Sequence, residues 1–102
     1  MTDEEIRIAQ DEINEIVRDM NITIGICPGC SDFDNVQYDL TSIYFLIKNN
    51  KIHEALEKIQ SITEKMNDMQ GNCPGCGRIE LIHSKLSHFA NFIGKHYEKE
   101  IA

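Results

Sequence analysis

The sequence predicts an all-α protein, a four-helix bundle built from two tandem helical hairpins. Three observations predict this fold: apolar residues recur at helical spacing in four segments, the connections between the segments are short, and the second half of the chain repeats the first. A chain of 102 residues with 41% hydrophobic and 26% charged residues has the size and composition of one globular domain. We therefore expect residues 1–102 to form a single domain.

The internal repeat has an offset of 46 residues and needs no gap. It begins with the alignment of Ile6 on Ile52 and extends to the alignment of Ile47 on Ile93. Two identical Cys-Pro-Gly-Cys segments, at 27–30 and 73–76, fall in the same alignment. We interpret residues 1–48 and 49–100 as two copies of one supersecondary unit.

The first copy contains two expected helices, one on each side of its Cys-Pro-Gly-Cys segment. The apolar residues of the first helix step by three and four positions, as in the buried stripe of an amphipathic helix: Ile6, Ala9, Ile13, Ile16 and Met20. Thr2 or Asp3 is its expected N-cap, and Gly25 its expected end. The second helix follows Asp32 and carries a stripe of the same kind: Phe33, Val36, Leu40, Ile43 and Ile47.

The second copy repeats this arrangement after a short polar break at residues 48–50. The third expected helix ends near Gly71 and has the stripe Ile52, Ala55, Ile59, Ile62, Met66 and Met69. The fourth has the stripe Ile79, Ile82, Leu86, Phe89 and Ile93. Short connections make neighbouring helices antiparallel, so both Cys-Pro-Gly-Cys turns are expected at the same end of the bundle.

Helical phase also predicts that the cysteines meet. Cys27 lies seven residues after Met20, and Cys73 lies seven residues after Met66, so both extend a core stripe. Cys30 and Cys76 extend the other heptad position. Two C-x-x-C turns supply four thiolates for a tetrahedral metal site, which zinc prefers, ahead of iron and Cu(I). The predicted metal ligands are therefore Cys27, Cys30, Cys73 and Cys76.

The second turn, at residues 73–77, reads Cys-Pro-Gly-Cys-Gly and resembles the CPxCG zinc knuckle of rubredoxin-like and zinc-ribbon proteins. The resemblance covers only the turns, and it implies a metal-binding turn without the β-ribbon fold, because the flanking segments are helical. The first turn departs from the knuckle, since Ser31 stands where the knuckle has glycine.

Two other interpretations of the cysteines remain open. A C-x-x-C pair at a helix N-terminus can hold a reactive thiolate, as in dithiol redox proteins, although those motifs follow a strand and this chain has no convincing strand. The cysteines can also pack as small hydrophobic side chains in hairpin turns.

The remaining residues give no catalytic pattern. His53, His83, His88 and His96 form no H-E-x-x-H motif, and we expect them to be solvated or to cap helix ends. His83 lies nearest a knuckle and is at most a hydrogen-bond partner of the cysteine ligands. A closed four-thiolate site leaves no open position for a reactive water, so an enzyme is not expected.

The charge restricts the class of partner. The formal net charge is −7, and residues 1–48 hold all of it, with ten Asp and Glu against three Lys and Arg. Such a chain repels phosphate backbones, which argues against nucleic-acid binding, and the acidic half is either a solvated face or a surface that docks on a basic partner. The acidic start is unlike a signal peptide and no apolar run is long enough to span a bilayer, so a cytoplasmic protein without membrane association is expected.

The second and fourth helices carry more apolar residues than one stripe needs, at 43–47 and around Phe92. This surplus indicates a homodimer or a partner groove through Tyr44, Phe45 and Phe92, or a helix that is buried all round.

Together these patterns predict a small zinc-binding helical protein with a structural four-cysteine site, acting as a protein-protein interaction or regulatory module for an unidentified protein partner. The alternative is a thiol-based metal carrier or a C-x-x-C dithiol redox protein. A third possibility, from charge alone, is an acidic inhibitor that mimics nucleic acid.

Overall fold

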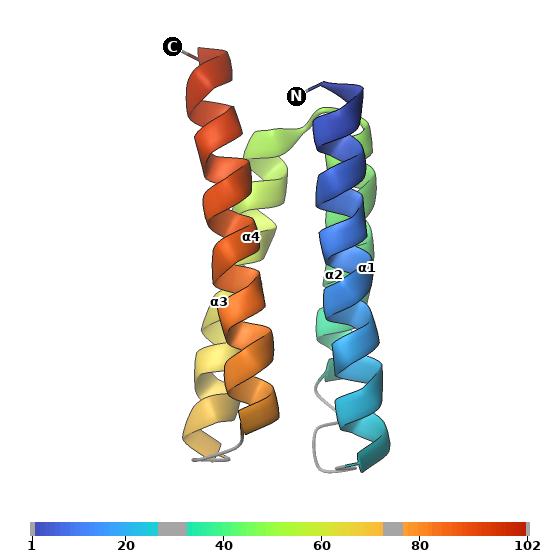
Figure 1. The fold of residues 1–102 in the computed structure, drawn as a ribbon. Coiled ribbons are helices and arrows are strands. Elements are labelled where there is room, and N and C mark those ends of the chain that lie inside the picture. The colour runs from blue at the N-terminus through green and yellow to red at the C-terminus, as the bar shows by residue number, and fades with distance from the viewer. Residues whose placement is uncertain (1, 27–32, 73–76, 102) are drawn as a thin grey trace.

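The computed structural model describes residues 2–26, 33–72 and 77–101. Within these ranges the chain forms four α-helices and no strand: α1 (Asp3–Ile26), α2 (Phe33–Lys48), α3 (Ile52–Asn72) and α4 (Gly77–Ile101). The helices lie side by side in a bundle that measures 41 × 20 × 18 Å along its principal axes (Figure 1). The predicted all-helical, four-helix architecture is confirmed.

The start of α1 is fixed by a reciprocal cap. The backbone N–H of Glu5 donates to Thr2 Oγ1 at 3.2 Å, and the backbone N–H of Thr2 donates to Glu5 Oε1 at 2.9 Å. This capping box satisfies donors that the first helical turn leaves unpaired. The hydrogen bonds from Thr2 hold the pKa of Glu5 below its usual value. Of the two expected caps, Thr2 is therefore the N-cap, and Asp3 is the first helical residue.

The glycines at the far ends of α1 and α3 do not stop their helices as predicted. Each helix continues one residue further, α1 to Ile26 and α3 to Asn72, because neither Gly25 nor Gly71 adopts the left-handed φ that ends a helix. Asp32, which directly precedes α2, lies outside the described residues.

The turn between α2 and α3 has the polar sequence predicted to break the helix. Asn50 has a φ of 60°, in the left-handed region. The N–H of Lys51 donates to the Leu46 carbonyl at 2.8 Å, and the N–H of Asn50 donates to the Ile47 carbonyl at 3.0 Å. These two bonds form a Schellman motif, which satisfies the last carbonyls of α2 and turns the chain sharply into α3.

The core consists of the predicted apolar stripes. Among the side chains that the structure describes, nineteen hydrophobic ones from all four helices are buried: Ala9, Ile13, Ile16, Met20, Val36, Leu40, Ile43, Ile47, Ile52, Ala55, Ile59, Ile62, Met66, Met69, Ile79, Ile82, Leu86, Phe89 and Ile93. Ile6, also expected in the core, is partly buried. Thr23 continues the stripe of α1, and its buried hydroxyl donates to the Asp19 carbonyl at 2.8 Å. Burial of these apolar side chains supplies most of the driving force for folding.

The helices form a closed ring in which α1 contacts α2 and α4, and α3 contacts α2 and α4. The end of α1, the start of α2, the end of α3 and the start of α4 all lie at one end of the bundle (Figure 1). The α2–α3 turn, the start of α1 and the end of α4 lie at the opposite end. Within the described residues, no helix combines the length and apolar character needed to cross a membrane.

Candidate functional site

The four predicted metal ligands, Cys27, Cys30, Cys73 and Cys76, lie outside the described residues. The structure describes the helix ends that flank them. Ile26 and Phe33 bound the first cysteine segment, Asn72 and Gly77 bound the second, and all four helix ends lie at the same end of the bundle. In the part of the chain that is described, no three His, Cys, Asp or Glu side chains are grouped so that they could hold a metal ion. The four-cysteine site stays a prediction.

The core extends toward these helix ends. Met20 and Met66, each seven residues before the first cysteine of a pair, are completely buried. Val36 and Ile79, near the starts of α2 and α4, are buried as well. The stripes on which the cysteine prediction depends therefore face the core in the described parts of all four helices.

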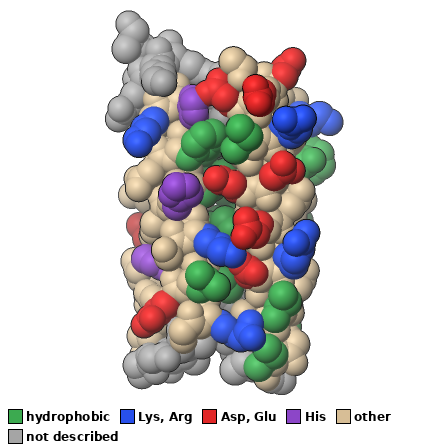
Figure 2. All heavy atoms as spheres, viewed as in Figure 1, with side chains coloured by type: hydrophobic (Ala, Val, Ile, Leu, Met, Phe, Trp, Pro, Cys, Tyr) green, Lys and Arg blue, Asp and Glu red, His purple; other side chains and the backbone are tan. Residues whose placement is uncertain are grey.

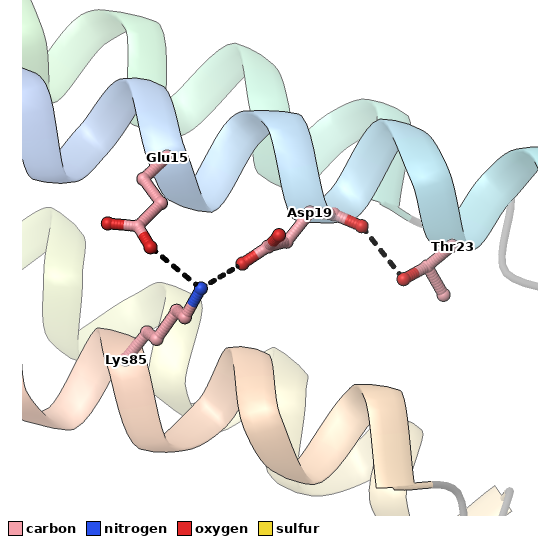
Figure 3. Close-up of polar contacts among 4 residues, drawn as sticks. All are labelled: Glu15, Asp19, Thr23 and Lys85. Carbon is pink, nitrogen blue, oxygen red and sulfur yellow. Dashed lines mark hydrogen bonds and ion pairs between the residues drawn. The ribbon is translucent and has the colours of Figure 1, made fainter.

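A charged cluster joins α1 to α4 (Figure 3). The Lys85 ammonium donates to Glu15 Oε1 at 3.0 Å and to the Asp19 carboxylate. The Lys85 and Asp19 side chains are only 29% and 24% exposed, whereas Glu15 is largely exposed. The hydrogen bond to Asp19, and to a lesser extent the one to Glu15, raises the pKa of Lys85 and so favours its positively charged form.

A second charged contact joins α2 to α3. The Lys65 ammonium lies 3.1 Å from Asp39 Oδ2, and the Asp39 side chain is mostly covered. The two contacts therefore bridge the two interfaces that connect the first pair of helices with the second pair. A separate bond ties α1 to α2, where the Gln37 side-chain amide donates to Asn21 Oδ1 at 2.6 Å.

A cleft of about 300 Å³ opens beside the charged cluster, between α1 and α4. Its lining residues are Glu12, Glu15, Ile16, Ser84, Lys85 and His88. Figure 2 shows this face of the molecule, with acidic side chains along its middle and histidines beside them. Glu12 Oε2 is buried and has no hydrogen-bond partner among the described residues. Burial raises the pKa of the Glu12 carboxyl, and the His88 Nε2 that lies 4.0 Å from its other oxygen opposes this rise.

The histidines only partly match the expectation of solvated or capping positions. His53 and His88 are exposed, and His53 lies 3.1 Å from Glu57 one turn later. His96 is instead mostly covered: it is 17% exposed, pairs with Glu5 across the α1–α4 interface and meets the Phe92 ring edge-on at 4.6 Å. Sequence reasoning missed this contact, because it depends on how α4 lies against α1.

His83 also differs from the expectation that it is solvated or caps a helix end. Its Nε2 atom is buried and has no hydrogen-bond partner among the described residues. Its predicted relation to a cysteine ligand falls on residues that the structure does not describe.

The three residues predicted to form an association face are not equally available. Phe45 is 53% exposed, whereas Tyr44 and Phe92 pack partly against the core of their own chain. The Tyr44 and Phe45 rings meet edge-on at 5.5 Å. Sequence reasoning missed other exposed apolar side chains, which are Ile8, Ile22, Ile26, Tyr38 and Leu81. Each of them lies outside the buried stripe of its helix.

No protein-family model, curated protein or solved structure matches the chain.

Proposed function

We propose that this chain is a small zinc-binding protein in which Cys27, Cys30, Cys73 and Cys76 hold one structural Zn²⁺. The observation that supports this most strongly is the combination of two identical Cys-Pro-Gly-Cys segments with four flanking helix ends at one end of the bundle. Segments far apart in sequence are thereby attached to neighbouring points of one scaffold. On this proposal, residues 1–48 and 49–100 are two copies of one hairpin that share a single metal.

Four thiolates suit zinc because they bind it tetrahedrally, with zinc-sulfur distances of about 2.3 Å. Iron and Cu(I) are the other metals that such a donor set accepts. With all four positions taken by sulfur, the ion has no place for a reactive water, so the proposed role is structural and not catalytic. The metal would crosslink the first pair of helices to the second and so stabilise the closed ring.

The metal-stabilised bundle would then act as a protein-protein interaction or regulatory module in the cytoplasm. The exposed Phe45 ring and the partly buried Tyr44 on α2, and the partly buried Phe92 on α4, are the apolar side chains proposed to contact a second copy or another protein. No nucleic-acid or membrane partner is proposed, because the first half of the chain carries the whole net charge of −7.

The decisive experiment measures bound metal and melting temperature together. We expect one Zn²⁺ per chain, four protected thiols, and a fall in melting temperature on chelation, because metal that binds only the folded chain stabilises it by mass action. Cys27→Ser and Cys73→Ser should each lose the metal and lower the melting temperature alike. Ser31→Ala, in the same segment, keeps all four cysteines and is the matched control.

The proposal fails if chelation and both cysteine variants leave the melting temperature unchanged, or if the purified chain has a disulfide in each turn and no metal. One observation favours the alternative of a metal carrier or dithiol redox protein: α4 begins at Gly77, directly after Cys76. The positive end of a helix lowers the pKa of a nearby thiol. Readily exchanged Cu(I), or easy formation of a Cys27–Cys30 disulfide without loss of fold, would support that alternative.

A further inference from the structure

The two charged contacts between the helix pairs occupy equivalent positions of the sequence repeat. Asp19 in α1 aligns with Lys65 in α3, and Asp39 in α2 aligns with Lys85 in α4. In the bundle, Asp19 contacts Lys85 and Asp39 contacts Lys65. The same two repeat positions therefore meet at both interfaces, and the first copy supplies both acids while the second supplies both bases.

The placement of both acids in the first copy and both bases in the second affects which copies can pair. If two first copies packed together in the same way, Asp19 of one would face Asp39 of the other. If two second copies did so, Lys65 would face Lys85. Like charges at such contacts repel, whereas the observed pairing of unlike copies brings opposite charges together at both interfaces.

The net charge of the first copy also opposes the pairing of two first copies. Residues 1–48 carry the entire net charge of −7, so two first copies would repel each other along their length. Many aligned core positions cannot discriminate between copies, because pairs such as Ile13 and Ile59, or Leu40 and Leu86, are identical and equally buried. The aligned core positions that differ, such as Ile43 and Phe89, carry no charge, so repulsion between like copies comes from the charged residues beside the core.

We propose that Asp19, Asp39, Lys65 and Lys85 select the partner of each helix pair: α1 and α2 accept a pair of the α3 and α4 kind and reject a second copy of themselves. The accepted partner is the second half of the same chain or the second half of another copy. The four charges thus limit the assembly of two helix pairs into one bundle to unlike halves. This inference does not depend on the cysteines binding metal.

The test exchanges two of the charges in the complete chain. Asp39→Lys combined with Lys85→Asp keeps the composition and net charge, but it places like charges at both contacts and opposite charges between like halves. Asp39→Lys combined with Lys65→Asp is the matched control, because it also exchanges one acid and one base yet keeps opposite charges at both contacts. All variants carry Glu15→Gln, so that position 85 faces a single acid.

We expect the first variant to melt at a lower temperature and to self-associate at a concentration about tenfold lower than the control, measured by sedimentation over a dilution series; tenfold corresponds to about 1.4 kcal/mol. Adding Asp19→Lys and Lys65→Asp to the first variant restores opposite charges at both contacts, and this fourfold variant should recover the melting temperature and the association behaviour of the control. Equal behaviour of the first variant and the control would overturn the proposal. Failure of the fourfold variant to recover would overturn it too, even if the first variant does not fold.

Discussion

The bundle predicts how three chemically identical substitutions should differ in cost. Leu40 and Leu86 occupy aligned positions of the repeat, in α2 and α4, and both are completely buried. Leu81 is also in α4 but is 52% exposed. Substitution of each leucine by alanine removes the same three carbon atoms, so any difference in cost reports the surroundings of the side chain.

The expected costs follow from burial. At about 0.8 kcal/mol for each buried carbon, Leu40→Ala and Leu86→Ala each lose about 2.4 kcal/mol of transfer free energy. The cavity that remains increases the loss to about 3–4 kcal/mol. Leu81→Ala removes a half-exposed side chain and leaves no enclosed cavity, so it should cost at most about 1 kcal/mol. A domain of this size has a free energy of unfolding of about 5–15 kcal/mol, so all three variants should fold.

Urea unfolding followed by circular dichroism measures these costs, with the slope of free energy against urea checked for constancy. Leu40→Ala and Leu86→Ala should agree to within about 1 kcal/mol, because their positions are equivalent. If Leu81→Ala proved as costly as either of them, the face of α4 assigned to the core would be wrong. A cost below about 1 kcal/mol for Leu40→Ala would refute the packing of α2.

Two further predictions concern the cleft and the turn. Burial raises the pKa of Glu12, so its ionised form destabilises the fold at neutral pH, and this destabilisation disappears as pH falls through the folded-state pKa. Glu12→Gln should therefore raise the melting temperature by about 3 °C at pH 7 and leave it unchanged near pH 4. An equal gain at both pH values would contradict this reasoning. Asn50 has a φ of 60°, which alanine adopts less readily than asparagine or glycine. Asn50→Ala should therefore lower the free energy of unfolding in urea by about 1 kcal/mol, whereas Asn50→Gly should leave it unchanged. Equal free energies of unfolding for the two variants would show that the left-handed turn is not needed.

The sequence predicts the helices and the core well because both depend on local spacing. A stripe of apolar residues at steps of three and four must face a partner wherever the helix lies, and residues such as Ile13, Leu40 and Ile59 are buried as expected. The polar break before α3 was also readable, since asparagine tolerates the left-handed conformation that Asn50 adopts. Antiparallel neighbours then follow from short connections.

Contacts beside the core could not be predicted, because they depend on how two helices lie against each other. The pairing of His96 with Glu5, and the burial of one Glu12 oxygen, both occur at the α1–α4 interface between the two ends of the chain. No local pattern relates those residues. The helix ends were predicted only to within one residue, since a glycine permits a left-handed φ without requiring it, as Gly25 shows.

One pair of neighbouring helices in the closed ring, α1 and α4, is not consecutive in the sequence. The α2–α3 corner is tied by the turn at Asn50, whereas α1 and α4 are consecutive in the ring but not in the sequence. Among the residues that the structure describes, side-chain contacts such as the Lys85 cluster join α1 to α4 there. The α1–α4 interface is the least extensive of the four, and no short turn holds these two helices together. Local opening of the native state should therefore begin with the separation of α1 from α4. Amide hydrogens along α1 and α4 should then exchange with solvent before those at the α2–α3 interface.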